Sequence, residues 1–297
     1  MWTPIMHSLK ITPLAAESMG IRSMATFVES KKIRLLIDPG ACVTDQRFDL
    51  PPHPLETWRL EKLHDRIQSF FKSAQAIIIT CFHDDHITES FASLYKGKIL
   101  FIQNPNNHIT ADCRKKAFRF LNRVKGLPLD IIYMDNRAFE LGDLCIHFSK
   151  PNACGHEDKK GTCIPLAVTW KDDSFVYSSH IAGAFNKKGL SWIISKRPTF
   201  LYLDGPGTAM KSRDRSALPH FFNFMKQLLN EAPPKILLLD HHVLRDVNWR
   251  KNMEPLYKMA ADQKVKLQTA AEYRGETMDL LEARRKQLYA NETANQR

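Results

Sequence analysis

The sequence contains no long hydrophobic run, no signal-peptide pattern at its start and no dense set of cysteines. No apolar run approaches the roughly 18 to 20 residues that span a bilayer, so we expect no membrane segment. The opening MWTPIMHSLK lacks the hydrophobic core of a signal peptide. The 6 cysteines are scattered through a long chain, which excludes the disulfide framework of a small secreted domain and predicts mostly free thiols. We therefore expect a cytoplasmic protein without a membrane partner.

The composition is that of a globular protein. It is 43% hydrophobic and 25% charged, with 12 glycines and 16 prolines, which excludes a disordered or fibrous chain. A length of 297 residues allows one large or two ordinary domains. We expect one domain over residues 1–275, followed by a polar helix or tail over residues 276–297.

The formal net charge of +11 could serve an anionic partner such as nucleic acid. The basic residues are nevertheless spread widely, with short clusters at residues 114–116, 159–160, 187–188 and 284–286. We interpret these clusters mainly as solvated faces, and we keep nucleic acid as an alternative partner.

Strand and helix patterns alternate along most of the chain. Strands are predicted over residues 8–16, 26–29, 33–37, 76–80, 98–102, 130–133, 139–148, 164–170, 175–177, 200–203 and 235–239. Helices are predicted over residues 55–71, 111–124, 216–229, 247–264 and 278–289. Residues 17–23 are expected to form a polar loop, and His53 and His64 are expected to be ordinary surface residues.

The stretch AIIITCFHDDHITES combines a buried strand with metal-binding groups. Its three consecutive isoleucines suit a strand covered on both faces. Directly after this strand come Cys81, His83, Asp85 and His86. Each of them alone is typical of a cap or a solvated loop, but thiol, imidazole and carboxylate groups packed this tightly indicate a cation site that suits zinc.

Polar, metal-capable residues also follow other predicted strands. They are Asp38, Cys154, His156, His180, Asp204, Asp240, His241 and His242. Loops that place such residues on one rim of a sheet build a pocket from distant parts of the sequence. Each residue alone is explained as a turn or a cap, whereas their recurrence in the same local setting predicts a shared site.

Several longer segments carry a family resemblance. They are ITPLAAESMGIRSMATFVE, LLIDPG, DLPPHPLE, LYLDGP and LLLDHHVLRD. Through them, nearly the whole chain resembles the metallo-β-lactamase superfamily, and within it a little-characterised, mostly archaeal family of metallo-β-lactamase-like proteins. The resemblance implies an α/β (α+β) fold, the four-layer αββα sandwich, in which two mixed sheets pack face to face between outer helices.

The superfamily signature of His, any residue, His, any residue, Asp, His is matched by His83, Asp85 and His86. Three positions differ from the usual ligands. Cys81 stands where the signature has its first His, Cys154 stands where the family has a His before Gly, and His180 stands where a bridging Asp is expected. The closing His is present as His241 or His242.

The resemblance implies two sets of metal ligands, one for each ion of a dinuclear centre. The first set would be Cys81, His83 and Cys154, and the second Asp85, His86, His180 and His241 or His242. One or two Zn²⁺ ions are expected, with iron or manganese as alternatives. Because an imidazole does not bridge as a carboxylate does, a single zinc, two weakly coupled metals and an empty pocket all remain open.

The function implied by the resemblance is a metal-dependent hydrolase, in which a metal-bound hydroxide attacks an ester or phosphodiester of unknown identity. Asp85 would hold a metal and orient the water, and His241 or His242 would ligate or protonate the leaving group. Asp38, Asp204 and Asp240 would support the ligands from behind. Two alternatives remain: a non-catalytic binding protein with a degenerate metal site, and a nucleic-acid-processing hydrolase.

Overall fold

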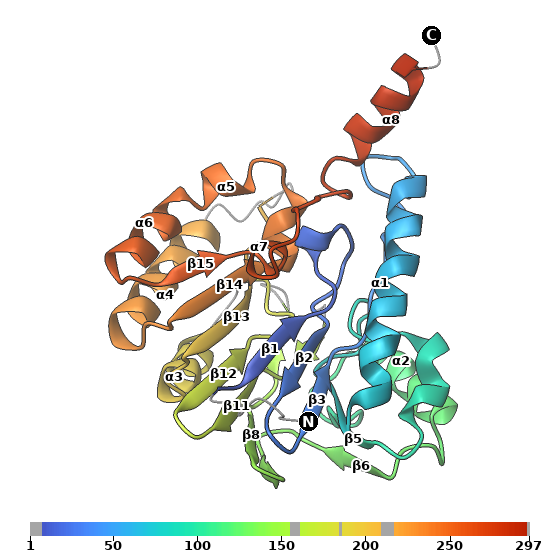
Figure 1. Ribbon diagram of the computed structural model, residues 1–297, viewed down its shortest axis with the longest axis vertical. Helices are drawn as coiled ribbons and strands as arrows, with labels where there is room; N and C mark the ends of the chain where they lie inside the picture. The colour runs from blue at the N-terminus through green and yellow to red at the C-terminus, as the bar shows by residue number, and fades with distance from the viewer. Residues whose placement is uncertain (1–7, 155–160, 184–185, 209–216, 296–297) are drawn as a thin grey trace, which may run out of the picture.

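The computed structural model describes residues 8–154, 161–183, 186–208 and 217–295. Two large sheets form its centre (Figure 1). The first has six strands in chain order: β1 (Lys10–Pro13), β2 (Thr26–Glu29), β3 (Arg34–Ile37), β4 (Ala76–Ile79), β5 (Ile99–Ile102) and β6 (Asp130–Tyr133). Its first three strands are antiparallel, and β3 to β6 run parallel.

The second sheet has seven strands in the order β15-β14-β13-β12-β11-β8-β7. Their bounds are β7 (Ala138–Leu141), β8 (Leu144–Phe148), β11 (Leu166–Trp170), β12 (Asp173–Tyr177), β13 (Phe200–Asp204), β14 (Ile236–Asp240) and β15 (Lys266–Gln268). Strands β12 to β15 run parallel. A small separate hairpin joins β9 (Asn152–Ala153) to β10 (Thr162–Cys163).

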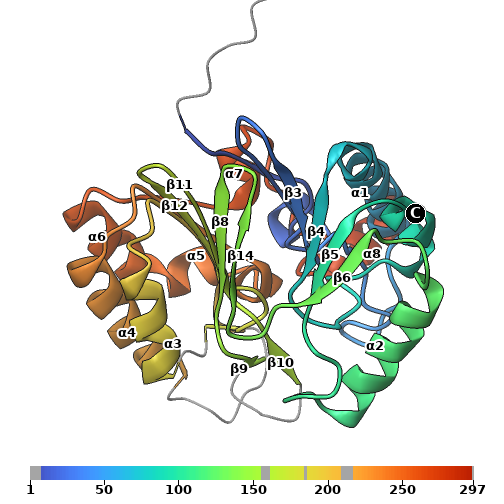
Figure 2. The ribbon, with the colours of Figure 1, turned by 90° about the horizontal axis from the view of Figure 1, so that it is seen from below.

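Helices cover the outer face of each sheet, as Figure 2 shows. The helices α1 (Pro54–Ser73) and α2 (Ala111–Arg123) lie outside the first sheet, and α3 (Lys187–Ser195), α4 (Ala217–Glu231), α5 (Trp249–Asn252) and α6 (Glu254–Asp262) lie outside the second. The architecture is therefore the expected αββα sandwich. No helix among the described residues has the length and apolar character needed to cross a membrane.

The strand before the central polar stretch is buried on both faces, as the run of isoleucines predicts. Ile77, Ile78 and Ile79 are all 0% exposed. One face of β4 packs beneath α1 and the other packs on the second sheet, so alternation of polar and apolar residues is absent. This rigid strand fixes where the next residues leave the sheet.

Shorter elements complete the chain: the 3₁₀ segments η1 (Glu17–Met19), η2 (Glu89–Tyr95) and η4 (His241–Arg245), and the helices α7 (Ala270–Tyr273) and α8 (Arg285–Asn295). Helix α8 projects away from the sandwich (Figure 1).

Several predicted elements differ from the observed ones. The opening strand is limited to β1, and residues 17–23 are a buried segment rather than a polar loop, since Glu17 is 4% exposed. The helix predicted over residues 247–264 is divided at Met253 into α5 and α6, and β15 follows it unpredicted. The last helix begins at Arg285.

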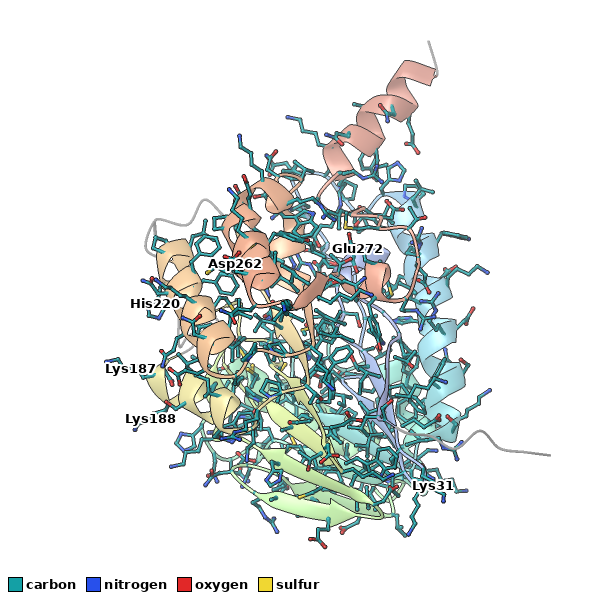
Figure 3. The ribbon with its side chains drawn as sticks, turned by 60° about the vertical axis from the view of Figure 1, so that its left-hand side comes forward. Lys31, Lys187, Lys188, His220, Asp262 and Glu272 are labelled. Atoms are coloured by element: carbon teal, nitrogen blue, oxygen red, sulfur yellow. The ribbon has the colours of Figure 1, made fainter. Side chains whose placement is uncertain are left out.

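The basic residues lie on separate outer surfaces. Lys31 lies at the tip of the β2–β3 hairpin, whereas Lys187 and Lys188 project from the start of α3 on another side of the molecule (Figure 3). All three are exposed. Of these residues, Lys187 and Lys188 form one of the basic clusters named from the sequence.

Candidate metal centre

The carboxyl ends of parallel strands from both sheets meet at one rim, and the chain places its polar residues there. Strand β4 ends just before Cys81, β12 leads to His180, and β14 leads to His241. Backbone and side-chain hydrogen bonds connect these ends, including a contact of 2.5 Å between the hydroxyl oxygens of Thr80 and Ser179. Crevices outside the carboxyl ends of strands are common ligand sites in α/β proteins.

A close backbone contact locks the two loops of the first sheet together. The turn after β3 reaches Gly40, where an added Cβ would lie 2.1 Å from the backbone nitrogen of Ile87. Only glycine permits this approach. Asp38, Ser179 and His241 adopt left-handed backbone conformations with φ of 47°, 57° and 65°, a conformation that non-glycine residues rarely adopt and that gathers at functional sites.

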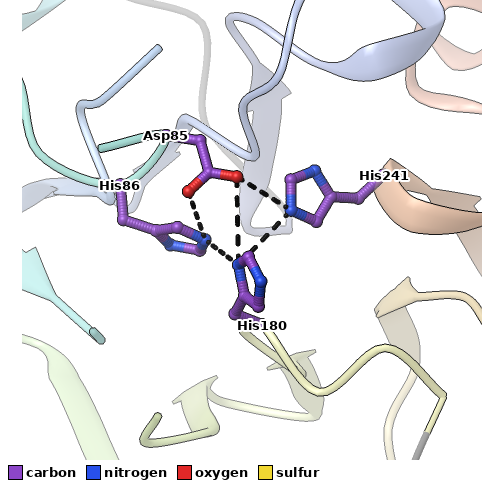
Figure 4. Close-up of side chains that lie close together, drawn as sticks. All are labelled: Asp85, His86, His180 and His241. Carbon is purple, nitrogen blue, oxygen red and sulfur yellow. Dashed lines mark hydrogen bonds and ion pairs between the residues drawn. The ribbon is translucent and has the colours of Figure 1, made fainter. Parts of the chain in front are cut away.

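Four buried residues gather into one group at this rim (Figure 4): Asp85, His86, His180 and His241. Their ligand atoms lie within 4.8 Å of one another. His180 Nδ1 lies 3.0 Å from His86 Nε2 and 3.5 Å from His241 Nε2. Asp85 Oδ2 lies 3.3 Å from His241 Nε2. Three nitrogens and one oxygen therefore face a common point.

Buried carboxylates fix the rings of two of these histidines. His86 Nδ1 donates to Asp38 at 2.7 Å, and His241 Nδ1 donates to Glu17 at 2.9 Å. Each bond directs Nε2 at the group, where a metal would take the place of a proton, and so fixes the ring in the orientation that a metal-binding histidine needs. This arrangement is the fit expected of a metal centre, because imidazole and carboxylate ligands suit zinc, iron and manganese.

Asp38 is more than a turn residue, because its carboxylate also accepts hydrogen bonds from the backbone and hydroxyl of Thr80 and from the Tyr177 hydroxyl. The sequence predicts Asp38 behind the ligands, and its contact with His86 has that geometry. Asp240 instead accepts backbone N–H groups of Ser18, His241 and Ala270. It therefore positions the chain around His241 rather than the imidazole itself.

Asp204, His241 and His242 form another close group. Here the carboxylate is already satisfied, since it accepts from His242 Nδ1 at 2.9 Å and from the backbone of Ala182 at 2.6 Å. The contact is thus explained as an Asp–His hydrogen bond. It fixes the ring of His242, whose other nitrogen is left for the cavity that His242 lines.

The remaining group joins Cys81, His83 and His180. The sulfur of Cys81 lies 3.4 Å from His83 Nδ1. The first ligand set was expected to contain Cys154, whereas the structure brings His180 together with Cys81 and His83. Cys154 belongs to none of the three groups of described residues, because its thiol is buried beside that of Cys163. His156 lies outside the described residues.

The charges within the site oppose the effects of burial. Burial alone would raise the pKa of Asp85, but His180, His241 and His86 hold it well below its usual value. Burial alone would lower the pKa of His86, but Asp38 raises it to about 9. An ionised carboxylate thus lies among imidazoles that also face buried acids. The centre is built for a charged occupant rather than for apolar packing.

A cavity of about 420 Å³ opens over the centre. Among the residues that line it are His83, Asp85, His180 and His242. Its wall also contains Arg22, Cys42, Asp84, Thr110, Asp112, Cys113, Lys116 and Arg245.

Local sequence patterns did not indicate Glu17, Arg22 or Arg245 as site residues, although all three lie within the segments that carry the resemblance. Glu17 alone carried a signal, because it follows the apolar run PLAA and precedes Met19. A charged residue in such a setting is buried only when it is paired, and here its partners are His241 and Arg245. His241 and Arg245 are separated from Glu17 by 224 and 228 residues in sequence.

The sandwich and its His/Asp cluster define a protein of the metallo-β-lactamase fold, the fold of metal-dependent hydrolases. Solved structures agree. The chain is similar to the metallo-β-lactamase fold protein YhfI from Bacillus subtilis, with a TM-score of 0.56 and 14% identity over 88% of this chain and 95% of that one. It is also similar to Igni18, a metallo hydrolase from Ignicoccus hospitalis, with a TM-score of 0.51 and 15% identity over 91% and 96%.

Relatives in sequence identify the family. A UPF0282 protein of Saccharolobus solfataricus is 34% identical over 290 residues, which cover 95% of this chain and 93% of that protein. A UPF0282 protein of Sulfurisphaera tokodaii is 35% identical over 294 residues, which cover 96% of this chain and 94% of that protein. The chain belongs to the UPF0282 family, in agreement with the archaeal family that the sequence resembles. No family model matches it.

Proposed function

We propose that this protein is a metal-dependent hydrolase of an ester or phosphodiester, with its metal, most simply zinc, held by Asp85, His86, His180 and His241. The observation that carries the proposal is the pair of histidines whose Nδ1 atoms donate to buried carboxylates and whose Nε2 atoms meet Asp85 and His180. A bound divalent metal lowers the pKa of water and polarises the substrate oxygen.

The protein's own groups would orient the reactants. Asp85 is buried and ionised, so it would hold the metal and align the attacking water. His242 is fixed through Nδ1 by Asp204 and lines the cavity. Burial lowers the pKa of His242 to about 4, so the ring is neutral and its Nε2 would take a proton from the attacking water before passing it to the leaving oxygen. His241 is a poorer candidate for that role, because its Nδ1 is engaged by Glu17 and its Nε2 faces Asp85.

Metal analysis of the purified protein tests the proposal. Wild type is expected to retain about one equivalent of zinc, iron or manganese, and His86→Ala and His241→Ala are expected to lose most of it. His220→Ala is the matched control, because His220 is an exposed histidine on the outer side of α4 (Figure 3). Wild type that neither retains nor binds any of these metals would refute the proposal.

A second candidate is a binding protein that kept the fold without catalysis. The observation that favours it is Cys81, a fully buried thiol at the position of an expected histidine, whose pKa is raised by burial. The variant Cys81→His with His180→Asp restores the usual superfamily residues at both positions. If wild type is inactive on a panel of esters and phosphodiesters while this double variant is active, the binding protein is the better assignment.

A further inference from the structure

Two arginines stand out in the cavity wall because they lie beside the metal group without being part of it. Arg22 and Arg245 both line the cavity together with His180 and His242. Arg245 Nη2 lies 3.4 Å from His241 Nε2 and 3.7 Å from Asp85 Oδ2. A group bound to these guanidiniums would therefore adjoin the proposed metal position.

Each guanidinium is held along one edge by a buried carboxylate. Arg22 donates from Nε and Nη2 to the two oxygens of Glu282 at 2.6 and 2.7 Å. Arg245 donates from Nε to Glu17 at 2.5 Å, with a longer contact of 3.5 Å from Nη2. No described residue accepts a hydrogen bond from the Nη1 of either arginine. Both side chains are thus oriented while keeping donors unused.

Three guanidiniums and three carboxylates meet beside the metal group, and Asp85, 3.7 Å from Arg245, is the carboxylate that a bound metal would engage. Arg47 Nε lies 3.8 Å from Glu282, so three guanidiniums share the carboxylates of Glu17 and Glu282. Burial and the like charge of Arg245 act to lower the pKa of Arg22. The hydrogen bonds to Glu282 outweigh them, and the pKa of Arg22 is raised above its ordinary value. With Asp85 engaged by a metal, the carboxylates of Glu17 and Glu282 are left facing three guanidiniums, so an anion in the cavity would be favoured.

Apart from Asp85 of the metal group, the acidic residues of the cavity wall are Asp84 and Asp112, which come from other elements. Asp84 follows β4 and is paired with Lys116 of α2 at 2.7 Å, and Asp112 lies in the first turn of α2. They disfavour an anion on their part of the wall. The arginine side is therefore the part of the cavity that suits a single negative group.

We propose that Arg22 and Arg245 bind the phosphate of a phosphodiester substrate and place its phosphorus beside the metal group. This inference rests on the proposed hydrolase function and selects the phosphodiester over a neutral ester. In the reaction, the water oxygen forms a bond to phosphorus, the bond from phosphorus to one ester oxygen breaks, and a proton from the water ends on that oxygen. Arg22 and Arg245 act as positioning groups for the anionic oxygens.

The experiment compares wild type with Arg22→Gln and Arg22→Lys. Arg22 is chosen because Arg47 also lies near Glu282, at 3.8 Å. Replacing Arg22 therefore does not leave the Glu282 carboxylate without a positively charged neighbour. Arg123→Gln is the control, an exposed arginine on α2 that pairs with Glu89 outside the cavity. The probes are inorganic phosphate, measured by calorimetry, and the turnover of bis(p-nitrophenyl) phosphate and p-nitrophenyl acetate. Metal content and thermal unfolding are measured on every variant.

Arg22→Gln is expected to weaken phosphate binding about tenfold or more, and to raise KM for the phosphodiester more than it lowers kcat. Arg22→Lys should fall between it and wild type. Metal content should stay at the wild-type level, and acetate hydrolysis should fall less than phosphodiester hydrolysis does, whereas Arg123→Gln should match wild type in every measurement. Wild type that does not bind phosphate, or Arg22→Gln that binds it as well as wild type does, would overturn the inference.

The two proposals fail differently. Protein without metal or turnover refutes the hydrolase, yet arginine-dependent phosphate binding would still establish the anion site. Protein with metal and phosphodiesterase turnover that is indifferent to Arg22→Gln refutes the anion site alone. A loss of acetate and phosphodiester hydrolysis by the same factor would show a general structural role for Arg22 and would also overturn the inference.

Discussion

Single residues in the candidate centre are held by hydrogen bonds that the sequence could not specify. His83, Asp85 and His86 were recognisable from their spacing after a buried strand. Glu17 and Arg245 were not, because the partners that make a buried charge stable are distant in sequence. The position of Cys154 could not be specified either, since the β9–β10 hairpin places its thiol beside Cys163.

Removing the acceptor behind His86 should weaken metal binding without removing a ligand. Asp38→Asn offers one oxygen where Thr80, His86 and Tyr177 all donate. We expect the metal affinity to fall on the order of 10- to 100-fold, because His86 loses its fixed tautomer. Competition with a chromophoric chelator measures this affinity. Unchanged affinity in a folded Asp38→Asn variant would contradict the role given to Asp38.

His64, expected from the sequence to be an ordinary surface residue, should contribute to the pH dependence of stability. Burial lowers its pKa below 6.5, although its Nε2 donates to the carbonyl of Ala41. Below pH 6.5 the unfolded state therefore takes up a proton that the folded state resists, and the free energy of unfolding should fall as the pH falls. The loss of unfolding free energy should begin near pH 6.5 and continue as the pH falls towards the lower pKa that His64 has in the folded state.

The matched variant is His64→Gln, which keeps an N–H donor but does not titrate. Urea unfolding at about pH 7.5 and about pH 5 should show wild type losing more stability than His64→Gln between the two conditions. Equal losses in both proteins would contradict this prediction.

At the scale of elements, the strands were the most predictable part of the fold and the short connections the least. The isoleucine run of β4 and the apolar runs of β13 and β14 predict directly that these strands are buried. The 3₁₀ segment η1 and the split between α5 and α6 depend on contacts with other elements, so local pattern did not reveal them.

The turn after β3 should be intolerant of any side chain at its glycine. In Gly40→Ala the new Cβ would meet backbone atoms of His86 and Ile87 at 2.1 to 2.6 Å. Backbone cannot move aside as a flexible side chain does, so we expect a loss of about 3 kcal/mol or more in unfolding free energy.

Gly97→Ala is the control for that variant. Gly97 has a positive φ of 73° but no atom within 4 Å of an added Cβ, so its loss should be nearer about 1 kcal/mol. Chemical denaturation of both variants measures the difference. A Gly40→Ala protein as stable as Gly97→Ala would contradict the close packing of the two loops.

Helix α8 is attached to α1 by a buried ion pair. Arg285 is 0% exposed and donates from Nε and Nη2 to Glu56 at 2.7 Å, and it also donates to the carbonyls of Leu50 and Thr44. Arg285→Ala leaves a buried carboxylate uncompensated and should cost about 3 to 5 kcal/mol. Denaturant unfolding measures this loss, and Arg284→Ala next to it, an exposed position, should cost far less.

At the scale of the whole molecule, the convergence of strand ends could be foreseen from local patterns, whereas the αββα order was implied by the family resemblance. A parallel strand that ends in polar residues places them on a known edge of the sheet. What the pattern could not give is the cavity wall, since Arg22 and Arg245 come from opposite ends of the chain and meet only in the folded sandwich.

The net charge of +11 leaves nucleic acid as a predicted alternative partner. If it is a partner, retention on immobilised RNA or DNA should weaken steeply as salt is raised, because phosphate contacts release counterions. Chromatography over a salt gradient measures this. Absent or salt-insensitive retention would remove nucleic acid, and the dispersed placement of Lys31, Lys187 and Lys188 in Figure 3 favours that result.

The central claim is that Asp85, His86, His180 and His241 hold one metal ion between them. Anomalous diffraction recorded at the absorption edge of the metal found in the purified protein tests it most directly. We expect a single strong peak within about 2.0 to 2.3 Å of the nitrogen and oxygen atoms of these four residues. A peak bound only by Cys81 and His83, or crystals of metal-supplied protein with no peak at the rim, would contradict it.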